Sequence, residues 1–242
     1  MNENLTISVA MAAYNGEKYI SEQIESILPQ LKENDELIIS INPSSDKTEK
    51  IVRTYQENDR RIKVIECPKK GVLANFENAI KLCKNDIIFL SDQDDVWVNN
   101  KIESQLLYFN DSSVGGVCHG CKYIDCNGQL MNQQPAKKEN HEIHFWEIVK
   151  RNPVQGSTLA FRRELADFFL PFPKGIPMHD SWIGLFICRK SKLIYLSAPL
   201  LLYRQHEGTV TVRVHKSVMN MLKDRIKIIA YMSRKKLEKG VL

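Results

Sequence analysis

The chain has 242 residues, which is enough for one large domain or two closely joined lobes with a sizeable core. Its hydrophobic content of 43% and charged content of 26% are those of a soluble globular protein. No apolar run reaches the ~18 residues that span a bilayer, and residues 1–4 do not resemble the start of a signal peptide. These properties argue against the integral membrane and secreted classes, and we expect a cytoplasmic protein.

The net charge of +5 is unevenly distributed. Residues 213–242 hold nine Lys or Arg and two Asp or Glu, a net charge of +7, so the remainder has a net charge of −2. Residues 217–239 predict a basic amphipathic helix, which either packs on the second lobe or attaches peripherally to the anionic inner face of the plasma membrane. Its predicted apolar stripe consists of Met219, Leu222, Ile226, Ile229 and Leu237. Nucleic acid is not an expected partner, because no aromatic-rich binding motif accompanies this charge.

Apolar strands alternate with helices in the first half of the chain. This alternation predicts right-handed βαβ units and a parallel sheet, whose ligands bind beyond the carboxyl ends of the strands. Residues 14–16, 42–44 and 92–94 follow three of the predicted strands and therefore should meet at that edge. We expect strands at 5–13, 36–41, 62–67 and 86–91, and helices at 17–30, 46–58, 73–82 and from about residue 99.

The pattern changes after about residue 110. Asn127-Gly128 predicts a hairpin turn. A short helix over 141–150 is expected to turn Phe145 and Trp146 inward. We further expect strands at 114–123, 157–161 and 193–196, helices at 163–169 and 180–189, and a loop at 171–177. The chain is therefore divided into 1–110, 111–212 and 213–242.

A dense acidic run follows the fourth predicted strand. Asp92, Asp94 and Asp95 lie within four residues, directly after apolar sequence and just before Trp97. A solvated loop that caps the next helix would explain one acid near a helix N-terminus, but not three. The charge instead predicts a divalent cation, Mg²⁺ or Mn²⁺, that carries a phosphorylated ligand.

Together with further motifs, this run resembles the GT-A fold glycosyltransferases of family 2, in particular bacterial rhamnosyltransferase-like members. The resemblance covers about residues 5–210 and implies an α/β fold. A Rossmann-like, mostly parallel nucleotide-binding sheet in 1–110 would merge with a smaller acceptor-binding lobe in 111–212. The resemblance is carried by SVAMAAYNG (8–16), EQIESILPQ (22–30), FLSDQDDVW (89–97) with Lys101, GST (156–158), HDSW (179–182) and YRQH (203–206).

The resemblance also implies the residues of a donor site. Asp92-Gln93-Asp94 looks like the D-x-D motif of the family, in which Asp94 would hold the metal ion and Asp92 would contact the ribose. His206 resembles a histidine that joins the metal or diphosphate site, although it is equally compatible with a loop histidine packed beside Tyr203. The full donor-nucleotide set implied is Ala12, Tyr14, Asn15, Asn42, Asn75, Asp92 and Asp94.

Asp180 looks like the catalytic base of the family, because a carboxylate near the acceptor hydroxyl can take its proton. The same residue is also a candidate N-cap for the helix that follows, and the two roles are compatible. The acceptor-binding candidates are Trp97, Gly156 and Ser157. Trp97 follows charged residues, which favours a wall of the site, although a core position is the alternative. Trp182 is expected in the core instead.

One segment departs from the family pattern. At the end of the second strand the family usually carries two acids followed by a glycine, where this chain has Ile41, Asn42 and Pro43. Asn42 still offers an amide to a base or ribose, but Pro43 fixes φ and removes a donor. This departure predicts weak donor binding, an unusual donor or a catalytically poor relative.

The function predicted by the resemblance is an inverting, metal-dependent glycosyltransferase with a nucleoside-diphosphate-sugar donor. A dTDP- or UDP-sugar is expected, with rhamnose as one candidate. The acceptor would be a hydroxyl of a cell-surface polysaccharide precursor, on a glycan or a lipid-linked glycan. The alternative is a non-catalytic nucleotide-binding or scaffolding subunit of a glycan-assembly complex, which Ile41 and Asn42 keep open.

Overall fold

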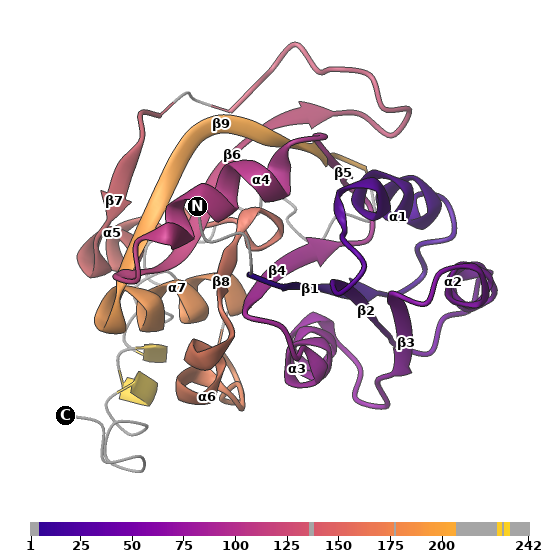
Figure 1. Ribbon diagram of the computed structural model, residues 1–242, viewed down its shortest axis with the longest axis horizontal. Helices are drawn as coiled ribbons and strands as arrows, with labels where there is room; N and C mark the ends of the chain where they lie inside the picture. Colours follow the sequence, from indigo (N-terminus) through magenta and orange to yellow (C-terminus); the bar gives the residue numbers. More distant parts are fainter. Residues whose placement is uncertain (1–4, 136–137, 177, 207–226, 229, 233–242) are drawn as a thin grey trace.

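The computed structural model describes residues 5–135, 138–176, 178–206, 227–228 and 230–232. One mixed sheet of nine strands runs through this part of the chain, with helices on both faces (Figure 1). The strand order is β3-β2-β1-β4-β8-β6-β9-β5, and β7 pairs with β9. The predicted α/β class with a mostly parallel first half is confirmed.

The first half forms the four parallel strands that the sequence predicted. β1 is apolar over almost its whole length because both faces of this central strand are buried. β1 pairs with β2 on one side and β4 on the other, so the carboxyl ends of these three strands lie next to one another. The elements are β1 (Ile7–Ala13), α1 (Ile20–Ile27), β2 (Glu36–Ile41), α2 (Thr48–Asn58), β3 (Ile62–Glu66), α3 (Val72–Leu82) and β4 (Ile87–Asp92).

The second half continues the same sheet. β4 pairs antiparallel with β8, β8 pairs antiparallel with β6, and β6 pairs parallel with β9. The elements are β5 (Val96–Trp97), α4 (Lys101–Leu106), β6 (Val114–Ile124), β7 (His141–Ile143), α5 (Phe145–Lys150), β8 (Ala160–Arg162), α6 (Ala166–Phe169), α7 (His179–Lys190) and β9 (Lys192–Arg204).

Several predictions in this half were wrong in extent or type. Residues 141–143 are a strand and not the start of a helix, because they pair with Leu193–Tyr195 of β9. β9 runs on for eight residues beyond the predicted 193–196, to Arg204, and β6 pairs with this extension across two register shifts. Trp146 is 70% exposed, so only Phe145 packs against the core.

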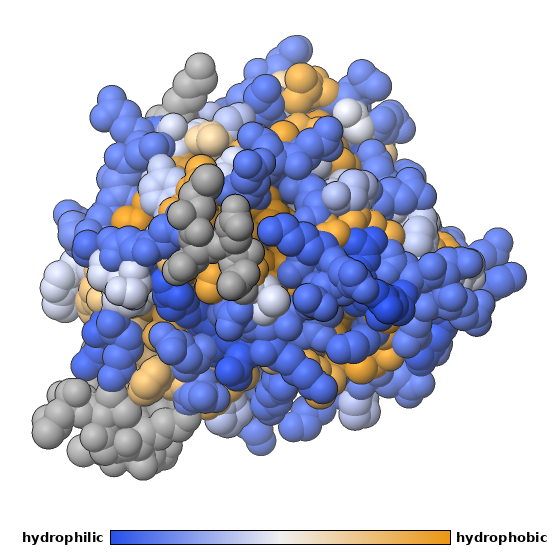
Figure 2. All heavy atoms as spheres, in the orientation of Figure 1, coloured by the Kyte–Doolittle hydropathy of each residue, from blue (hydrophilic) through white to orange (hydrophobic). Residues whose placement is uncertain are grey.

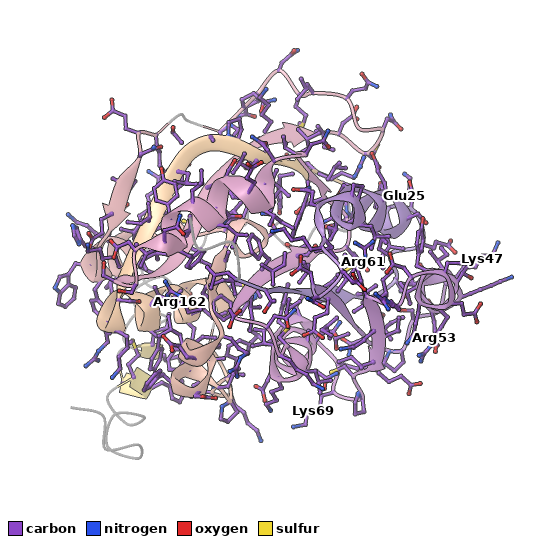
Figure 3. The ribbon with its side chains drawn as sticks, viewed as in Figure 1. Glu25, Lys47, Arg53, Arg61, Lys69 and Arg162 are labelled. Atoms are coloured by element: carbon purple, nitrogen blue, oxygen red, sulfur yellow. The ribbon has the colours of Figure 1, made fainter. Side chains whose placement is uncertain are left out.

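The sheet divides the apolar core into two layers. α1, α2 and α4 supply one layer, and α3, α5, α6 and α7 supply the other. Each layer contains residues from both predicted lobes, so the two lobes are packed together through both layers of the core. Arg162, labelled in Figure 3, reinforces the junction by donating to the carbonyls of Val114 and Phe109.

The face seen in Figure 2 is mainly hydrophilic, with small scattered apolar areas. Among the described residues, no helix is both long and apolar enough to cross a bilayer. Most of the predicted helix 217–239 lies outside the described residues. Of the part that is described, Ile228 and Met232 are buried in the core, and neither belongs to the predicted apolar stripe.

Candidate active site

The carboxyl ends of β1, β2 and β4 gather polar groups at one edge of the sheet. Ala12 lies opposite both Ser40 and Asp92, so the loops that follow these strands emerge side by side. Tyr14 is 54% exposed beyond this edge. Asn15 has a φ of 46° and accepts a hydrogen bond from the Ser45 amide at 2.9 Å. The nucleotide-binding role of Ala12, Tyr14 and Asn15 stays a prediction.

Gln93 joins the first loop to the acidic motif. The Tyr14 amide donates to Gln93 Oε1 at 2.8 Å, and Gln93 Nε2 donates to the Tyr14 carbonyl at 2.7 Å. The glutamine can approach so closely because Gly16 has no side chain: a Cβ there would stand 2.2 Å from Gln93 Oε1. Sequence reasoning quoted Gln93 inside the motif but assigned it no role.

Asn42 and Asn75 are buried and use their side chains inside the protein, which differs from their predicted contact with the nucleotide. Asn42 is 4% exposed, and its amide nitrogen donates to the Cys67 carbonyl at 2.8 Å and the Lys69 carbonyl at 2.9 Å. Asn42 Oδ1 accepts the Gly71 amide at 3.2 Å, which uses the remaining side-chain group. Asn42 therefore holds the 67–71 loop.

Asn75 is equally occupied. It is 2% exposed, its Oδ1 accepts Ser40 Oγ at 2.6 Å, and its Nδ2 donates to the Ala13 carbonyl at 3.0 Å. These bonds fix the ends of β1 and β2 to α3, so Asn75 supports the site from behind.

The acidic motif concentrates negative charge where the surroundings are poorly solvated. Burial, together with the charges of Asp94 and Asp180, raises the pKa of Asp92 to about 7. The Asp95 pKa is also raised well above its usual value, first by burial and then by Asp94 and Asp92. Asp95 Oδ1 accepts the Arg204 amide at 3.0 Å, but its buried Oδ2 has no hydrogen-bond partner. Such a cluster favours an added cation.

Asp94 and His206 meet as the resemblance implied. His206 Nε2 lies 2.9 Å from Asp94 Oδ2, and both side chains remain partly accessible at 17% and 20%. The imidazole packs against Tyr19, with ring centroids 4.9 Å apart. It therefore belongs to the acidic site and is not simply a loop histidine beside Tyr203.

Arg204 positions this pair, a role that sequence reasoning missed. Its Nε donates to the Asp94 carbonyl at 2.9 Å, and its guanidinium stands 4.8 Å above the Tyr19 ring. A salt bridge of 2.5 Å joins it to Glu22 of α1. The arginine is 2% exposed, so its buried guanidinium stabilises the backbone of Asp94, the candidate metal ligand.

The Asp94–His206 pair fits a divalent cation that arrives with a diphosphate. Mg²⁺ commonly binds one or two carboxylates plus substrate phosphates and water, and Mn²⁺ also accepts imidazole. In the part of the chain that the structure describes, no group of three or more His, Cys, Asp or Glu forms a complete metal cage. Two protein ligands would leave positions for phosphate oxygens and water.

Asp180 lies in the first turn of α7, whose N-cap is Met178, so Asp180 is not the cap itself. Burial raises the pKa of Asp180 to about 6, while the Ser181 amide and the Asn152 side chain partly oppose this rise. The Asp180 charge also acts on the Asp92 carboxyl, which places both acids at one site. A carboxylate with this pKa is ionised at neutral pH and can accept a proton.

His179 and Gly156 pack behind Asp180. His179 stacks on Phe76 with ring centroids 4.2 Å apart, and burial lowers its pKa to about 4, so the ring is neutral at physiological pH. A Cβ on Gly156 would stand 2.5 Å from His179 Nε2. Gly156 is therefore needed for close packing, which differs from the predicted contact with an acceptor.

The other predicted acceptor residues are also buried. Trp97 is 2% exposed and packs on Phe89, with ring centroids 5.9 Å apart, so it is a core residue and not the wall of an open site. The Ser157 side chain is fully buried. Its hydroxyl lies close enough to Asp92 and Asp95 to favour their charged forms, although it makes no hydrogen bond of good geometry. The predicted Trp182 core position is confirmed, because Trp182 is 0% exposed.

A buried Lys101 lies behind the acidic cluster. Its Nζ is 2.7 Å from His119 Nε2, donates to the Ser157 carbonyl at 3.0 Å and stands 4.6 Å above the Trp97 ring. Burial lowers the Lys101 pKa to about 7, and the Asp95 charge opposes this. The His119 pKa is lowered well below its usual value, first by burial. A neutral His119 with a proton on Nδ1 donates to the Gly120 carbonyl and accepts from Lys101, which satisfies both ring nitrogens.

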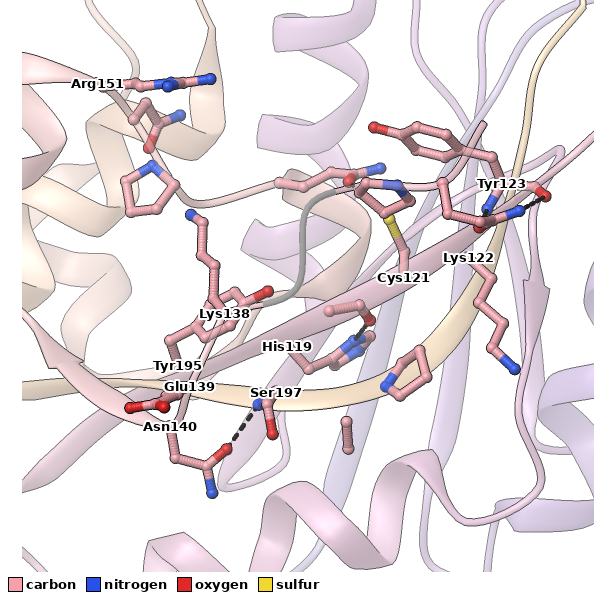
Figure 4. A pocket seen from close by; sticks show the side chains of 18 of the residues that line it. His119, Cys121, Lys122, Tyr123, Lys138, Glu139, Asn140, Arg151, Tyr195 and Ser197 are labelled. Atoms are coloured by element: carbon pink, nitrogen blue, oxygen red, sulfur yellow. Dashed lines mark hydrogen bonds between the residues drawn. The ribbon is translucent and has the colours of Figure 1, made fainter. Parts of the chain in front are cut away.

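A large cavity opens on the second lobe. Its volume is about 1630 Å³, and it is lined by β6, residues 133–135 and 138–140, residues 150–155 and the exposed bend of β9 (Figure 4). Asn152, whose side chain acts on Asp180, belongs to its lining. Of the predicted acceptor residues none lines this cavity, whereas the adjacent Gln155 does.

These features can be compared with known proteins. The family model described as glycosyl transferase family 2 matches residues 8–170. The chain belongs to this family. The UDP-Glc:alpha-D-GlcNAc-diphosphoundecaprenol beta-1,3-glucosyltransferase WfgD of Escherichia coli is 33% identical over 220 residues, covering 89% of this chain and 83% of the relative. The chain spans only about half the length of some other curated relatives, 55% and 54% in two of them.

Solved structures share the fold. Staphylococcus aureus TarS 1-349 in complex with UDP-GlcNAc matches with a TM-score of 0.73 at 19% identity, over 96% of this chain and 67% of that chain. The mannosyltransferase PcManGT from Pyrobaculum calidifontis in complex with GDP-Man and Mn²⁺ matches with a TM-score of 0.64 at 17% identity, over 94% and 64%. The predicted GT-A fold and family membership are therefore confirmed.

Proposed function

We propose that this family 2 chain is an inverting, metal-dependent glycosyltransferase that moves a sugar from a nucleoside-diphosphate-sugar to an acceptor hydroxyl. The observation that carries the proposal is the meeting of Asp92, the Asp94–His206 pair and Asp180 at the carboxyl edge of the sheet. The nucleotide-sugar complexes of TarS and PcManGT support the donor class.

In this proposal the exposed edge beyond β1 receives the nucleotide. Ala12, Tyr14 and Asn15 contact the base and ribose side, with Gln93 holding their loop in place. Asp94 and His206 would hold Mg²⁺ or Mn²⁺ beside the diphosphate, and PcManGT was solved with Mn²⁺. The ion, when bound, supplies Lewis-acid stabilisation of the charge that develops on the leaving diphosphate.

Asp180 accepts the proton of the acceptor hydroxyl as that oxygen attacks the anomeric carbon. The bond to the new oxygen forms while the bond to the diphosphate oxygen breaks. Attack from the face opposite the leaving group inverts the anomeric centre. Asn152 lies between Asp180 and the cavity, which is a suitable place for the acceptor to approach.

The proposed acceptor is a glycan or lipid-linked glycan that contributes to a cell-surface polysaccharide, and WfgD is named for a diphosphoundecaprenol-linked acceptor. We propose a dTDP- or UDP-sugar as donor, with rhamnose still one candidate sugar. The reaction is placed in the cytoplasm or at the inner face of the plasma membrane. Membrane contact through 217–239 stays a prediction.

The test is a thermal-shift panel of nucleoside diphosphates and their sugars, with and without Mn²⁺. Binding stabilises the folded state by mass action, so a nucleotide that raises the melting temperature only with metal supports the transferase and identifies the donor class. If no nucleotide shifts the transition, the proposed activity fails.

A scaffolding subunit is the second candidate. It is favoured by the Asn42 side chain, whose hydrogen-bonding groups are all used inside the protein, so that the second strand offers the nucleotide no carboxylate. Sugar transfer that is lost in Asp180→Ala would exclude this alternative.

A further inference from the structure

The cavity on the second lobe has a distinctive electrostatic character. Four cationic side chains and two carboxylates belong to its lining, a net charge of +2. This contrasts with residues 1–212, whose net charge is −2, and with the acidic edge that lies on the other side of Asp180. The cations are Lys122, Lys138, Lys150 and Arg151, and the carboxylates are Glu139 and Glu147.

The positive charge of three of these four cations is not neutralised by a nearby carboxylate in the described residues. Glu147 lies 3.3 Å from His141, which uses one of the two carboxylates. In the described parts of the chain, no carboxylate lies within 4.0 Å of the cationic groups of Lys122, Lys138 or Arg151. Free cations around a concave site attract an anion more strongly than cations on a flat surface, because the cavity walls limit solvent screening.

The walls of the cavity are held in place. The Tyr123 amide donates to Gln134 Oε1 at 2.8 Å, and the Ser197 amide donates to Asn140 Oδ1 at 2.7 Å, so both ends of the 133–140 segment are tied to the sheet. Lys138 Nζ stands 5.1 Å from the centre of the Tyr195 ring. In Figure 4 Lys138 rises beside Tyr195, with Arg151 and Lys122 on opposite sides of the view.

The size and position suit part of an acceptor. The volume of about 1630 Å³ exceeds the roughly 300–1,000 Å³ of common small-molecule sites, which leaves room for several groups in a row. Asn152 belongs to the lining and its side chain also acts on Asp180, so the cavity and the proposed base share a neighbouring residue. The donor diphosphate does not need these cations, because its proposed counter-ion lies at Asp94.

We propose that this cavity binds a phosphate group of the acceptor, attached to the sugar that receives the new linkage, through Lys138 and Arg151. The inference rests on the proposed transferase function and adds that the acceptor is anionic. Two sources share this chemistry: a phosphorylated water-soluble glycan, and a glycan on a lipid diphosphate. Repulsion from the acidic edge would keep the phosphate on the basic side, with the sugar hydroxyl directed at Asp180.

The first experiment uses inorganic pyrophosphate as the probe, in buffer with EDTA so that the metal-dependent donor site cannot bind it. Isothermal titration of the full chain is expected to detect binding. Lys138→Glu and Arg151→Glu should each weaken it by about tenfold or more, because each replaces a charge-assisted contact by a repulsion. Lys50→Glu, the same charge change on an exposed residue of α2, should leave it unchanged.

The outcomes separate clearly. Absence of pyrophosphate binding, or binding that the two cavity variants leave intact, would overturn the inference. All three variants should keep the wild-type melting temperature and metal-dependent nucleotide shift. If that nucleotide shift is absent from the wild type, the proposed function fails instead.

A second comparison distinguishes the sources of phosphate. N-acetylglucosamine 1-phosphate and a decyl diphosphate of the same sugar are titrated against the wild type and Arg151→Glu. Similar affinities for the two probes would indicate that the phosphate alone is recognised, whereas tighter binding of the decyl compound would indicate a lipid-linked carrier. Binding of both that is insensitive to Arg151→Glu would contradict the proposal.

Discussion

Asp180 provides the most direct test of the proposed chemistry, because its pKa of about 6 predicts the pH dependence of transfer. Burial disfavours the charged carboxylate, so protons bind more readily than in an ordinary aspartate. Only the ionised form can accept the proton of the acceptor hydroxyl. The rate should therefore be nearly independent of pH above about 7 and should fall as the pH decreases through 6.

The magnitude follows from the same value. Below the pKa, the ionised fraction falls about tenfold for each pH unit, so at pH 5 about a tenth of the maximum rate should remain. Asp180→Asn keeps the size of the side chain but cannot accept a proton. Loss of a general base typically costs about 10²–10⁴ in rate, which corresponds to roughly 3–5 kcal/mol of transition-state stabilisation.

The assay is initial-rate transfer from pH 5 to pH 8.5 with saturating donor and Mn²⁺. The matched control is Glu164→Gln, which makes the same chemical change at an exposed carboxylate of the second lobe. This control should retain both the wild-type rate and its acid limb. The residual activity of Asp180→Asn should lack the limb near pH 6.

Asp92 titrates close by, so the variant is needed for a clear assignment. The pKa of Asp92 is about 7, and its protonation also depends on Asp94. If the acid limb persisted in Asp180→Asn, it would belong to another group such as Asp92. Full activity of Asp180→Asn, or a wild-type profile that stays flat down to pH 5, would refute Asp180 as the base.

Three further predictions concern groups around this base. EDTA should abolish transfer, and added Mn²⁺ should restore it. His206→Ala should raise the Mn²⁺ concentration that gives the half-maximal rate about tenfold, whereas Asp94→Asn should be inactive at any Mn²⁺ concentration. Asp92→Asn should raise the free energy of unfolding of the metal-free protein by about 1–4 kcal/mol at pH 8, and the gain should shrink towards pH 4. The reason is that the raised pKa of Asp92 means that its ionised form opposes folding. A change in urea denaturation that does not depend on pH would contradict this. Lys101→Met should lower stability by about 2–5 kcal/mol, since it leaves two buried acceptors without a donor, and an unchanged urea midpoint would show that these bonds contribute nothing.

The buried strands of the first half could be predicted from sequence because burial on both faces of the sheet requires apolar residues along the strand. β1, β2 and β4 are apolar over most of their length since the sheet is covered on both faces. The short β7 has no such signature: its three residues become a strand by pairing with β9. β9 contains exposed residues near Ser197, which interrupt its apolar pattern, and the strand was therefore predicted to end at Leu196.

The acidic motif could be placed in the site from sequence, but the support around it could not. Asp94 and His206 are separated by 112 positions and were brought together only by resemblance to a family. Lys101 was quoted with the acidic motif but given no role, and its complete burial depends on the tertiary contacts with His119 and Trp97. For Trp97, an acidic neighbourhood suggested an exposed platform, whereas the ring packs inward on Phe89.

The unusual Ile41-Asn42-Pro43 segment is best understood through its hydrogen bonds. Asn42 donates both amide hydrogens to carbonyls of the 67–71 loop, at Cys67 and Lys69. An aspartate at this position would turn carboxylate oxygens towards those two carbonyls, leaving three acceptors without a donor. The asparagine therefore shapes the donor edge indirectly. The site already holds four acids, Asp92, Asp94, Asp95 and Asp180, and burial has raised the pKa of three of them. A neutral group at position 42 therefore avoids adding a fifth charge.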